Sequence, residues 1–123
     1  TARLHWYQKN YDEVIKLLQF VEYEDFTYYL GSRAMLLMTY YETDEIEPLY
    51  SLMDSFRAYL RRKKDKLPKN RIDNYLRLIH FIKKLTKVQA GNQKVLDQLK
   101  AEIRDAKVAS DEKWLLEKIA ELE

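Results

Sequence analysis

The sequence predicts an all-α protein in which about seven helices form stacked antiparallel hairpins. Only two glycines and two prolines interrupt its 123 residues, so good helix formers dominate and breakers are few. Apolar residues recur three and four positions apart along most of the chain, which is the spacing of one helix face. The regular turn residues of an all-β domain are missing. The length fits one domain, and a hydrophobic content of 46% suffices for a buried core.

Composition excludes several kinds of site. The chain has no cysteine, which rules out disulfides, thiolate metal sites and a cysteine nucleophile, and which fits a reducing compartment such as the cytoplasm. No apolar run approaches the ~18 residues that span a bilayer. The opening segment "TARLHWYQKN" lacks the apolar core of a signal peptide. We therefore expect no association with a membrane.

The first two expected helices cover residues 2–9 and 10–22. Asn10 can cap the second helix, and Glu13 three positions later completes a capping box. A turn follows, after which Asp25 or Thr27 is the next expected cap. Helical spacing places four apolar residues on one face of the second helix: Val14, Leu17, Leu18 and Val21.

The third expected helix, residues 28–42, is apolar on nearly every side, which is typical of a helix buried between neighbours. The fourth, residues 43–64, is amphipathic, and its start has two interpretations. Either Asp44 caps it together with Glu47, or Pro48 is its first helical residue. Its apolar face consists of Ile46, Leu49, Met53, Phe56 and Leu60.

Three more helices are expected in the remainder of the chain. Pro68 suits the start of a helix over residues 70–88, which carries two apolar faces. A turn at "AGN" leads to an amphipathic helix over residues 93–107. Ser110 can cap a last helix over residues 111–123, whose single apolar face would cover the end of the stack. The apolar positions of these helices are Ile72, Leu76, Leu78, Ile79, Phe81, Ile82 and Leu85; then Leu96, Leu99 and Ile103; then Leu115, Ile119 and Leu122.

A repeat of 35 residues relates the second and fourth expected helices. The segment "NYDEVIKLLQFV" aligns with "EIEPLYSLMDSF", so that Tyr11 falls on Ile46 and Leu18 falls on Met53, and "NQKVLDQLKAEI" is a third copy after an enlarged first helix. The period lies close to the ~34 residues of a tetratricopeptide repeat. On these segments the chain resembles the tetratricopeptide-repeat family.

Some positions support this resemblance, and others depart from the pattern of the family. "LLMTYYETDEIEPL" looks like the join between the two helices of the repeat, with Tyr40 at the aromatic position of the family. Asp44 stands where a glycine is usual, Leu49 replaces the common alanine, and Phe26 stands near the place of the repeat-ending proline. "LPKNRIDNYLRLIHFIKKL" and "DEKWLLEKIAELE" also resemble the C-terminal end of long, divergent bacterial repeat proteins.

The resemblance implies a fold and a kind of function. In this family, helical pairs stack into a right-handed superhelix that holds peptides or protein partners. Residues 1–123 would form a single domain of this type, the C-terminal fragment of a longer chain, with a capping helix near residues 110–122. The helix bearing Leu4, Trp6 and Tyr7 would lack its preceding neighbour and allow self-association through an exposed edge. On the repeat alignment, the concave side that would bind a partner carries Ala34, Met38 and Tyr41.

No arrangement of residues indicates catalysis, a cofactor or a metal ion. The two histidines, His5 and His80, lie on different expected helices, where packing is the simpler interpretation and a catalytic or metal role the alternative. Carboxylate pairs such as Asp12 with Glu13 fall at expected helix starts, where they stabilise free N–H groups and the helix dipole. A phosphate loop and the motifs HExxH, CxxC and GxSxG are absent. We therefore expect no catalytic, cofactor-binding or metal-binding residue.

A cluster of basic residues stands out from a nearly neutral total. The net charge is +2, yet residues 57–87 carry twelve basic and two acidic groups, whereas residues 1–56 carry four basic and ten acidic groups. The cluster falls at the end of one expected helix and the start of the next. It is a solvated turn that complements the helix dipole, a contact for an acidic partner, or a contact for a nucleic-acid backbone. A membrane surface is the fourth alternative, which the lack of a flanking apolar anchor disfavours. The seven residues of this basic patch are Arg61, Arg62, Lys63, Lys64, Lys66, Lys69 and Arg71.

The sequence therefore predicts a non-catalytic module for protein–protein interaction or scaffolding, with an unknown protein or peptide partner. The alternative is a helical domain that associates with nucleic acid through the basic patch. The acidic first part of the chain and the absence of a recognisable nucleic-acid motif favour a protein partner. A small helical enzyme is a third reading that no motif supports.

Overall fold

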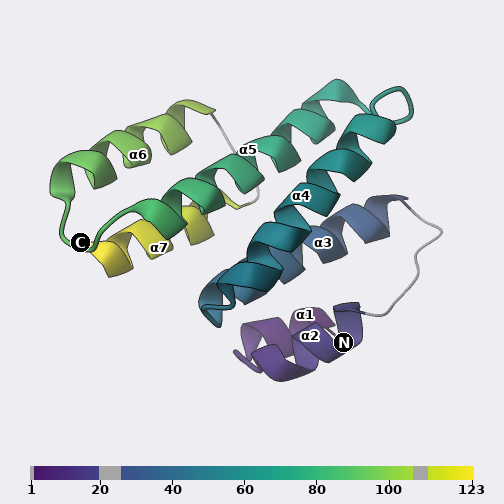
Figure 1. The fold of residues 1–123 in the computed structure, drawn as a ribbon, viewed down its shortest axis with the longest axis horizontal. Coiled ribbons are helices and arrows are strands. Elements are labelled where there is room, and N and C mark those ends of the chain that lie inside the picture. The colour runs from purple at the N-terminus through teal and green to yellow at the C-terminus, as the bar shows by residue number, and fades with distance from the viewer. Residues whose placement is uncertain (1, 20–25, 107–110) are drawn as a thin grey trace. The chain divides into compact units, whose positions relative to one another are not determined.

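The computed structural model describes residues 2–19, 26–106 and 111–123, and every regular element in these ranges is an α-helix (Figure 1). Seven helices and no strand occur in this part of the chain, as the sequence predicts. None of these seven helices has both the length and the apolar character needed to cross a membrane. The chain divides into two compact units, Thr1–Tyr59 and Leu60–Glu123, which we call the N-terminal and C-terminal units.

In the N-terminal unit, helices that follow one another in the chain pack together. α2 packs against both α1 and α3. The rings of Tyr29, near the start of α3, and Tyr59, near the end of α4, have centroids 4.2 Å apart, so these two helices run in opposite directions. The helices of this unit are α1 (Ala2–Tyr7), α2 (Tyr11–Gln19), α3 (Phe26–Glu42) and α4 (Ile46–Arg62), of which α4 continues into the C-terminal unit.

One turn geometry occurs twice in the N-terminal unit, 35 residues apart. Lys9 and Asp44 both adopt the left-handed conformation, with φ of 58° and 59°. The N–H of each donates to the carbonyl three residues earlier, at 3.0 and 3.1 Å. The N–H of the next residue donates to the carbonyl five residues earlier, at 2.8 and 3.0 Å. These paired bonds are the Schellman arrangement that ends a helix, and Asp44 takes the conformation in which glycine is the usual residue.

Matching positions of the 35-residue repeat are buried in both copies. Val14 and Leu49 are fully buried, and Leu18 and Met53 are 3% and 1% exposed. Leu17 departs from the prediction because it is 40% exposed, whereas its counterpart in the second copy is buried. α2 packs on α1 and α3, and Leu17 lies on the side that neither neighbour covers.

The third helix is buried on most of its sides, as its uniformly apolar sequence predicts. The hydroxyl of Thr39, which is fully buried, donates to the carbonyl of Met35 at 2.7 Å, so the helix satisfies this polar group itself. Arg33 ties α3 to α2: its guanidinium donates to the carbonyl of Leu18 at 2.7 Å and lies 5.2 Å from the ring centre of Tyr29. This bond joins α3 to a carbonyl near the C-terminal end of α2, where helix carbonyls lack partners within the helix.

The C-terminal unit contains three helices, each of which packs on the other two. Pro68 occupies the N-cap of the first, as predicted, where the missing N–H costs nothing. The predicted apolar faces are buried, except that Leu76 and Leu122 are half-buried. After the end of α4, the helices are α5 (Lys69–Lys87), α6 (Gln93–Ala106) and α7 (Glu112–Leu122).

Polar contacts join the end of α7 to α6 and to the connection that precedes it. The N–H of Gly91, whose φ is 84°, donates to the carbonyl of Leu122 at 2.7 Å. The ammonium of Lys100 pairs with the carboxylate of Glu123, to which the amide of Gln93 also donates at 3.5 Å. These two hydrogen bonds, the first above all, hold the pKa of the Glu123 carboxyl below its ordinary value.

The start of α4 differs from both interpretations of the sequence. The helix begins at Ile46, and the N–H of Leu49 donates to the carbonyl of Glu45 at 3.0 Å. Asp44 therefore belongs to the preceding turn, and Pro48 lies in the first turn of the helix, where no backbone N–H needs a partner. The predicted positions that fall outside the described residues are Val21, Asp25 and Ser110.

Candidate functional site

The basic patch lies where α4 ends and α5 begins, within the C-terminal unit. Two of its seven residues belong to the last turn of α4, two to the first turn of α5, and three to the connection 63–68. This connection is compact, since the N–H of Lys66 donates to the carbonyl of Lys63 at 2.9 Å. Five of the seven side chains are exposed, while Lys63 and Arg71 are partly buried. Short-range turn geometry thus gathers cations that are ten positions apart in sequence at most.

Positive charge in the basic patch has little local compensation. Asp65 is the one carboxylate in the segment 61–71. The ion pairs among the described residues include none with Arg61, Lys64, Lys66 or Lys69. The end of a helix dipole favours the arginines of α4 at this position. An anionic partner would relieve the mutual repulsion of the remaining cations, so the patch is suited to binding acidic groups.

The two tyrosines near the basic patch in sequence are engaged in packing. The ring of Tyr59 lies against that of Tyr29, with centroids 4.2 Å apart. Tyr75 is half-buried, and burial raises the pKa of its hydroxyl, an effect that Asp111 strengthens and Arg71 opposes. Proteins that bind single-stranded nucleic acid stack bases on exposed aromatic rings. Neither tyrosine presents an exposed ring of this kind.

The residues expected on a concave, partner-binding side are largely covered. Ala34 and Met38, both on α3, are 7% and 9% exposed, and Tyr41 is half-buried. Helical spacing does place the three on one side of α3. Of the three, Tyr41 offers the most surface, and the expectation that this trio binds a partner stays a prediction.

The first helix exposes the apolar surface that the sequence predicts. Leu4 is 53% exposed and Tyr7 is 75% exposed, whereas Trp6 is half-buried and contacts the ring of Tyr11 with centroids 6.4 Å apart. Exposed apolar side chains of this size favour association with another surface. Self-association through α1 stays a prediction.

The histidines lie in different environments and in different units. His5 is half-buried on α1, and its Nδ1 has no hydrogen-bond partner. His80 is exposed on α5, which corrects the expectation that it packs, although its ring lies 5.3 Å from that of Phe81. α5 has apolar residues on two faces, and His80 lies outside both of them. In the described part of the chain, no group of three or more potential ligand residues is placed to hold a metal ion.

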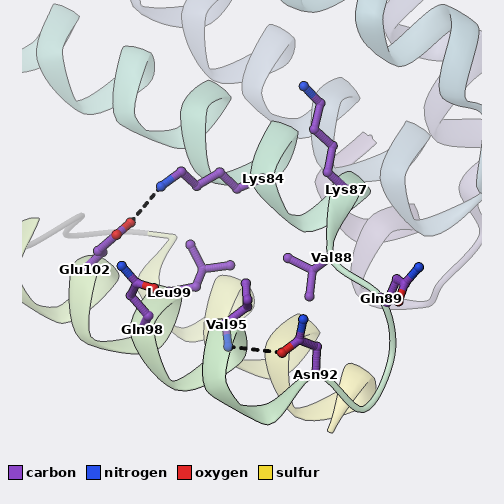
Figure 2. Close-up of a pocket in the computed structure, with 9 residues that line it drawn as sticks. All are labelled: Lys84, Lys87, Val88, Gln89, Asn92, Val95, Gln98, Leu99 and Glu102. Carbon is purple, nitrogen blue, oxygen red and sulfur yellow. Dashed lines mark hydrogen bonds and ion pairs between the residues drawn. The ribbon is translucent and has the colours of Figure 1, made fainter.

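A cleft in the C-terminal unit was not predicted from the sequence. It measures about 470 Å³ and lies between the end of α5, the following connection and one face of α6 (Figure 2). Val95 is its most informative residue, because it is an apolar side chain that is 38% exposed. Val95 precedes Leu96 and lies off the buried face of α6. An apolar residue outside the helical spacing of that face was the one feature of the sequence that could have indicated the cleft. The cleft is lined by Lys84, Lys87, Val88, Gln89, Asn92, Val95, Gln98, Leu99 and Glu102.

Two interactions shape this cleft. The ammonium of Lys84 pairs with the carboxylate of Glu102 at 3.0 Å and bridges α5 and α6 at one end, as Figure 2 shows. At the other end, the side-chain oxygen of Asn92 accepts the N–H of Val95 at 3.4 Å and caps α6. The ion pair thus joins the two walls, whereas the cap stabilises the start of α6 alone.

Comparisons with known proteins find no match to this chain among family models, curated proteins or solved structures. The fold and the surfaces described above therefore carry the functional argument.

Proposed function

We propose that the chain is a non-catalytic module for protein–protein interaction or scaffolding, built from stacked helical hairpins of the tetratricopeptide type. The observation that carries the proposal is the Schellman turn that recurs, bond for bond, at Lys9 and Asp44. Helical-repeat proteins use one backbone unit many times and vary its surface side chains to bind partners. The repeated turn and the matching buried positions support such a unit here.

The basic patch is the surface on which the proposed partner binds. Its exposed cations lie on a short connection between two well-packed helices, which positions them without burying them. Because Arg61, Lys64, Lys66 and Lys69 have no ion pair among the described residues, an acidic protein segment gains their full attraction. Electrostatic attraction of this kind speeds association and selects against basic partners.

A pair of charge-reversal variants tests this proposal. In the first, glutamate replaces four cations of the patch: Arg61, Lys64, Lys66 and Lys69. In the second, glutamate replaces four exposed cations elsewhere, which gives the same net charge: Arg3, Lys94, Arg104 and Lys113. Both variants should keep the helical circular dichroism spectrum, since exposed charges contribute little to stability.

The parent chain and the two variants then serve as baits for the capture of partner proteins. Mass spectrometry locates the cross-links between each bait and the proteins that it captures. We expect partners whose cross-links map to the segment 61–71, retained by the control variant and lost by the patch variant. Equal retention by both variants would contradict the patch as the binding surface. If no protein is captured by the parent chain under any salt condition, the interaction function itself is wrong.

Association with nucleic acid is the second candidate, and the same unpaired cations favour it. The packed tyrosines and the acidic N-terminal region weigh against it. We expect the parent chain to bind duplex and single-stranded probes no better than about 10⁻⁴–10⁻⁶ M at physiological salt, the range of non-specific binding. Fluorescence anisotropy at two salt concentrations measures this. Nanomolar binding that the patch variant abolishes and the control variant keeps would establish the nucleic-acid function in place of the first.

A further inference from the structure

The cleft of Figure 2 has an apolar floor. The side chains of Val88, Val95 and Leu99 converge between α5 and α6. Leu99 is 2% exposed and forms the bottom, whereas Val88 is half-buried and Val95 is 38% exposed. Val88 and Val95 supply the part of this surface that is open to water, so an aliphatic group that covered them would be bound favourably.

The charged groups of the cleft leave an excess of positive charge. Lys84 and Lys87 contribute two cations, and Glu102 contributes one anion. Glu102 already accepts the ammonium of Lys84 at 3.0 Å, and the ion pairs among the described residues include none with Lys87. The ammonium of Lys87 points away from α6 in Figure 2, so this cation acts on a ligand at the rim of the cleft through its charge and does not reach the floor. An anionic ligand is therefore attracted to the rim and a cationic ligand is repelled.

Three side-chain amides complete the lining, from Gln89, Asn92 and Gln98. An amide side chain offers two N–H donors and a carbonyl acceptor, the same groups that a peptide main chain needs as partners. The oxygen of Asn92 is engaged in capping α6, so its NH₂ group remains to donate to a ligand carbonyl. The amides on α6 and on the connection before it suit a polypeptide better than a fatty acid, whose chain has no polar group for them.

We infer that this cleft binds a short acidic peptide segment, in which an aliphatic side chain enters the apolar floor and a neighbouring carboxylate lies at the rim, where the charge of Lys87 attracts it. The inference rests on the proposed interaction function and adds a second, chemically defined contact to it. The volume of about 470 Å³ lies within the range of about 300–1,000 Å³ that ligand sites occupy, enough for one anchoring side chain and its flanking main chain.

A fluorescein-labelled peptide of sequence Gly-Ser-Glu-Leu-Glu-Leu-Glu-Gly-Ser is the probe. It should bind with a dissociation constant on the order of tens of micromolar, as expected for about twenty contacting atoms of ordinary efficiency. Serine in place of both leucines keeps the charge and should weaken binding at least about tenfold, because the floor then gains no apolar contact. Glutamine in place of the three glutamates keeps the leucines and should weaken binding several-fold.

Two matched variants locate the site. Val95→Asp places a carboxylate on the floor and should abolish binding, while its position in the first turn of α6 keeps the helix stable. Ala101→Asp places the same charge on an exposed position of the same helix outside the cleft and should leave binding unchanged. Methyl chemical-shift changes on addition of the peptide should concentrate on Val88, Val95 and Leu99.

Three outcomes would overturn the inference. The first is the absence of binding to the parent chain. The second is equal binding of the leucine and serine peptides, which would leave charge as the only attraction. The third is evidence that the peptide binds elsewhere, namely binding that survives Val95→Asp or methyl chemical-shift changes confined to the basic patch. Partners that cross-link to the basic patch while the peptide fails to bind would reject the cleft and leave the proposed function standing. Peptide binding at the cleft without patch-dependent partners would support the cleft and reject the basic patch as the binding surface.

Discussion

Two glycine-to-alanine substitutions are expected to change the stability of this chain in opposite directions. Gly31 is an exposed residue inside α3, and Gly91 lies between α5 and α6 with a φ of 84°. A methyl group added at either position meets no atom within 4 Å, so neither change causes a clash. The change in stability at each site therefore depends on the backbone conformation there and not on a steric clash.

The expected magnitudes follow from these two conformations. Gly31→Ala removes a glycine from a helix interior and should raise the free energy of unfolding by about 0.5–1 kcal/mol. Gly91→Ala puts a side chain in the left-handed region and should lower the free energy of unfolding by about 1–2 kcal/mol. The loss cannot be avoided by relaxing φ, because the N–H of Gly91 would then lose its 2.7 Å bond to the carbonyl of Leu122.

Urea unfolding, followed by circular dichroism and by tryptophan fluorescence, measures both changes. Trp6 lies in the N-terminal unit with Gly31, and Trp114 lies in the C-terminal unit with Gly91. Single-tryptophan backgrounds, in which phenylalanine replaces the other tryptophan, therefore report each unit even where the two unfold separately. Gly91→Asn serves as a reference, since asparagine tolerates the left-handed region and should lose less stability than alanine.

The reasoning would be refuted by a Gly91→Ala variant as stable as the parent chain, which would mean that residue 91 does not require a positive φ. A Gly31→Ala variant less stable than the parent would mean that this position is not an exposed helix interior. Equal losses for alanine and asparagine at residue 91 would assign the effect to something other than backbone conformation.

Three further predictions concern the repeat and the end of α7. Leu18→Ala and Met53→Ala, at matching buried positions, should each lower the free energy of unfolding by about 2–4 kcal/mol, and a loss under about 0.5 kcal/mol in urea unfolding would show that the repeat register is wrong. Asp44→Gly should raise the free energy of unfolding by about 0.5–1 kcal/mol, because glycine adopts a φ of 59° without strain, and a lower melting temperature would contradict this. The lowered pKa of Glu123, due chiefly to its hydrogen bond from Lys100, adds stability above the ordinary value of 4.5 that is lost as pH falls through the folded pKa. Glu123→Gln should therefore lose less stability than the parent on acidification, and parallel pH profiles would count against the pair.

Local patterns in the sequence determined most of the secondary structure. The sequence places all seven helices within a few residues of their observed bounds, mostly from apolar residues at helical spacing, and Pro68 marks the start of α5. The 35-residue offset anticipates that the turns at Lys9 and Asp44 share one geometry. These features are predictable because hydrogen bonds between residues three to five positions apart create them.

Only the tertiary structure decided which helix faces are covered by a neighbouring helix. Leu17 and Leu18 are adjacent and equally apolar, yet the first is 40% exposed and the second is 3% exposed. His80 was expected to pack and is exposed, while Val95 is exposed beside the fully buried Leu96. The cleft forms between α5, the following connection and α6, where the Lys84–Glu102 ion pair joins the two helices. Periodicity states which residues share a helix face, but burial depends on which faces meet a neighbour, and that is set by contacts between residues far apart in the chain.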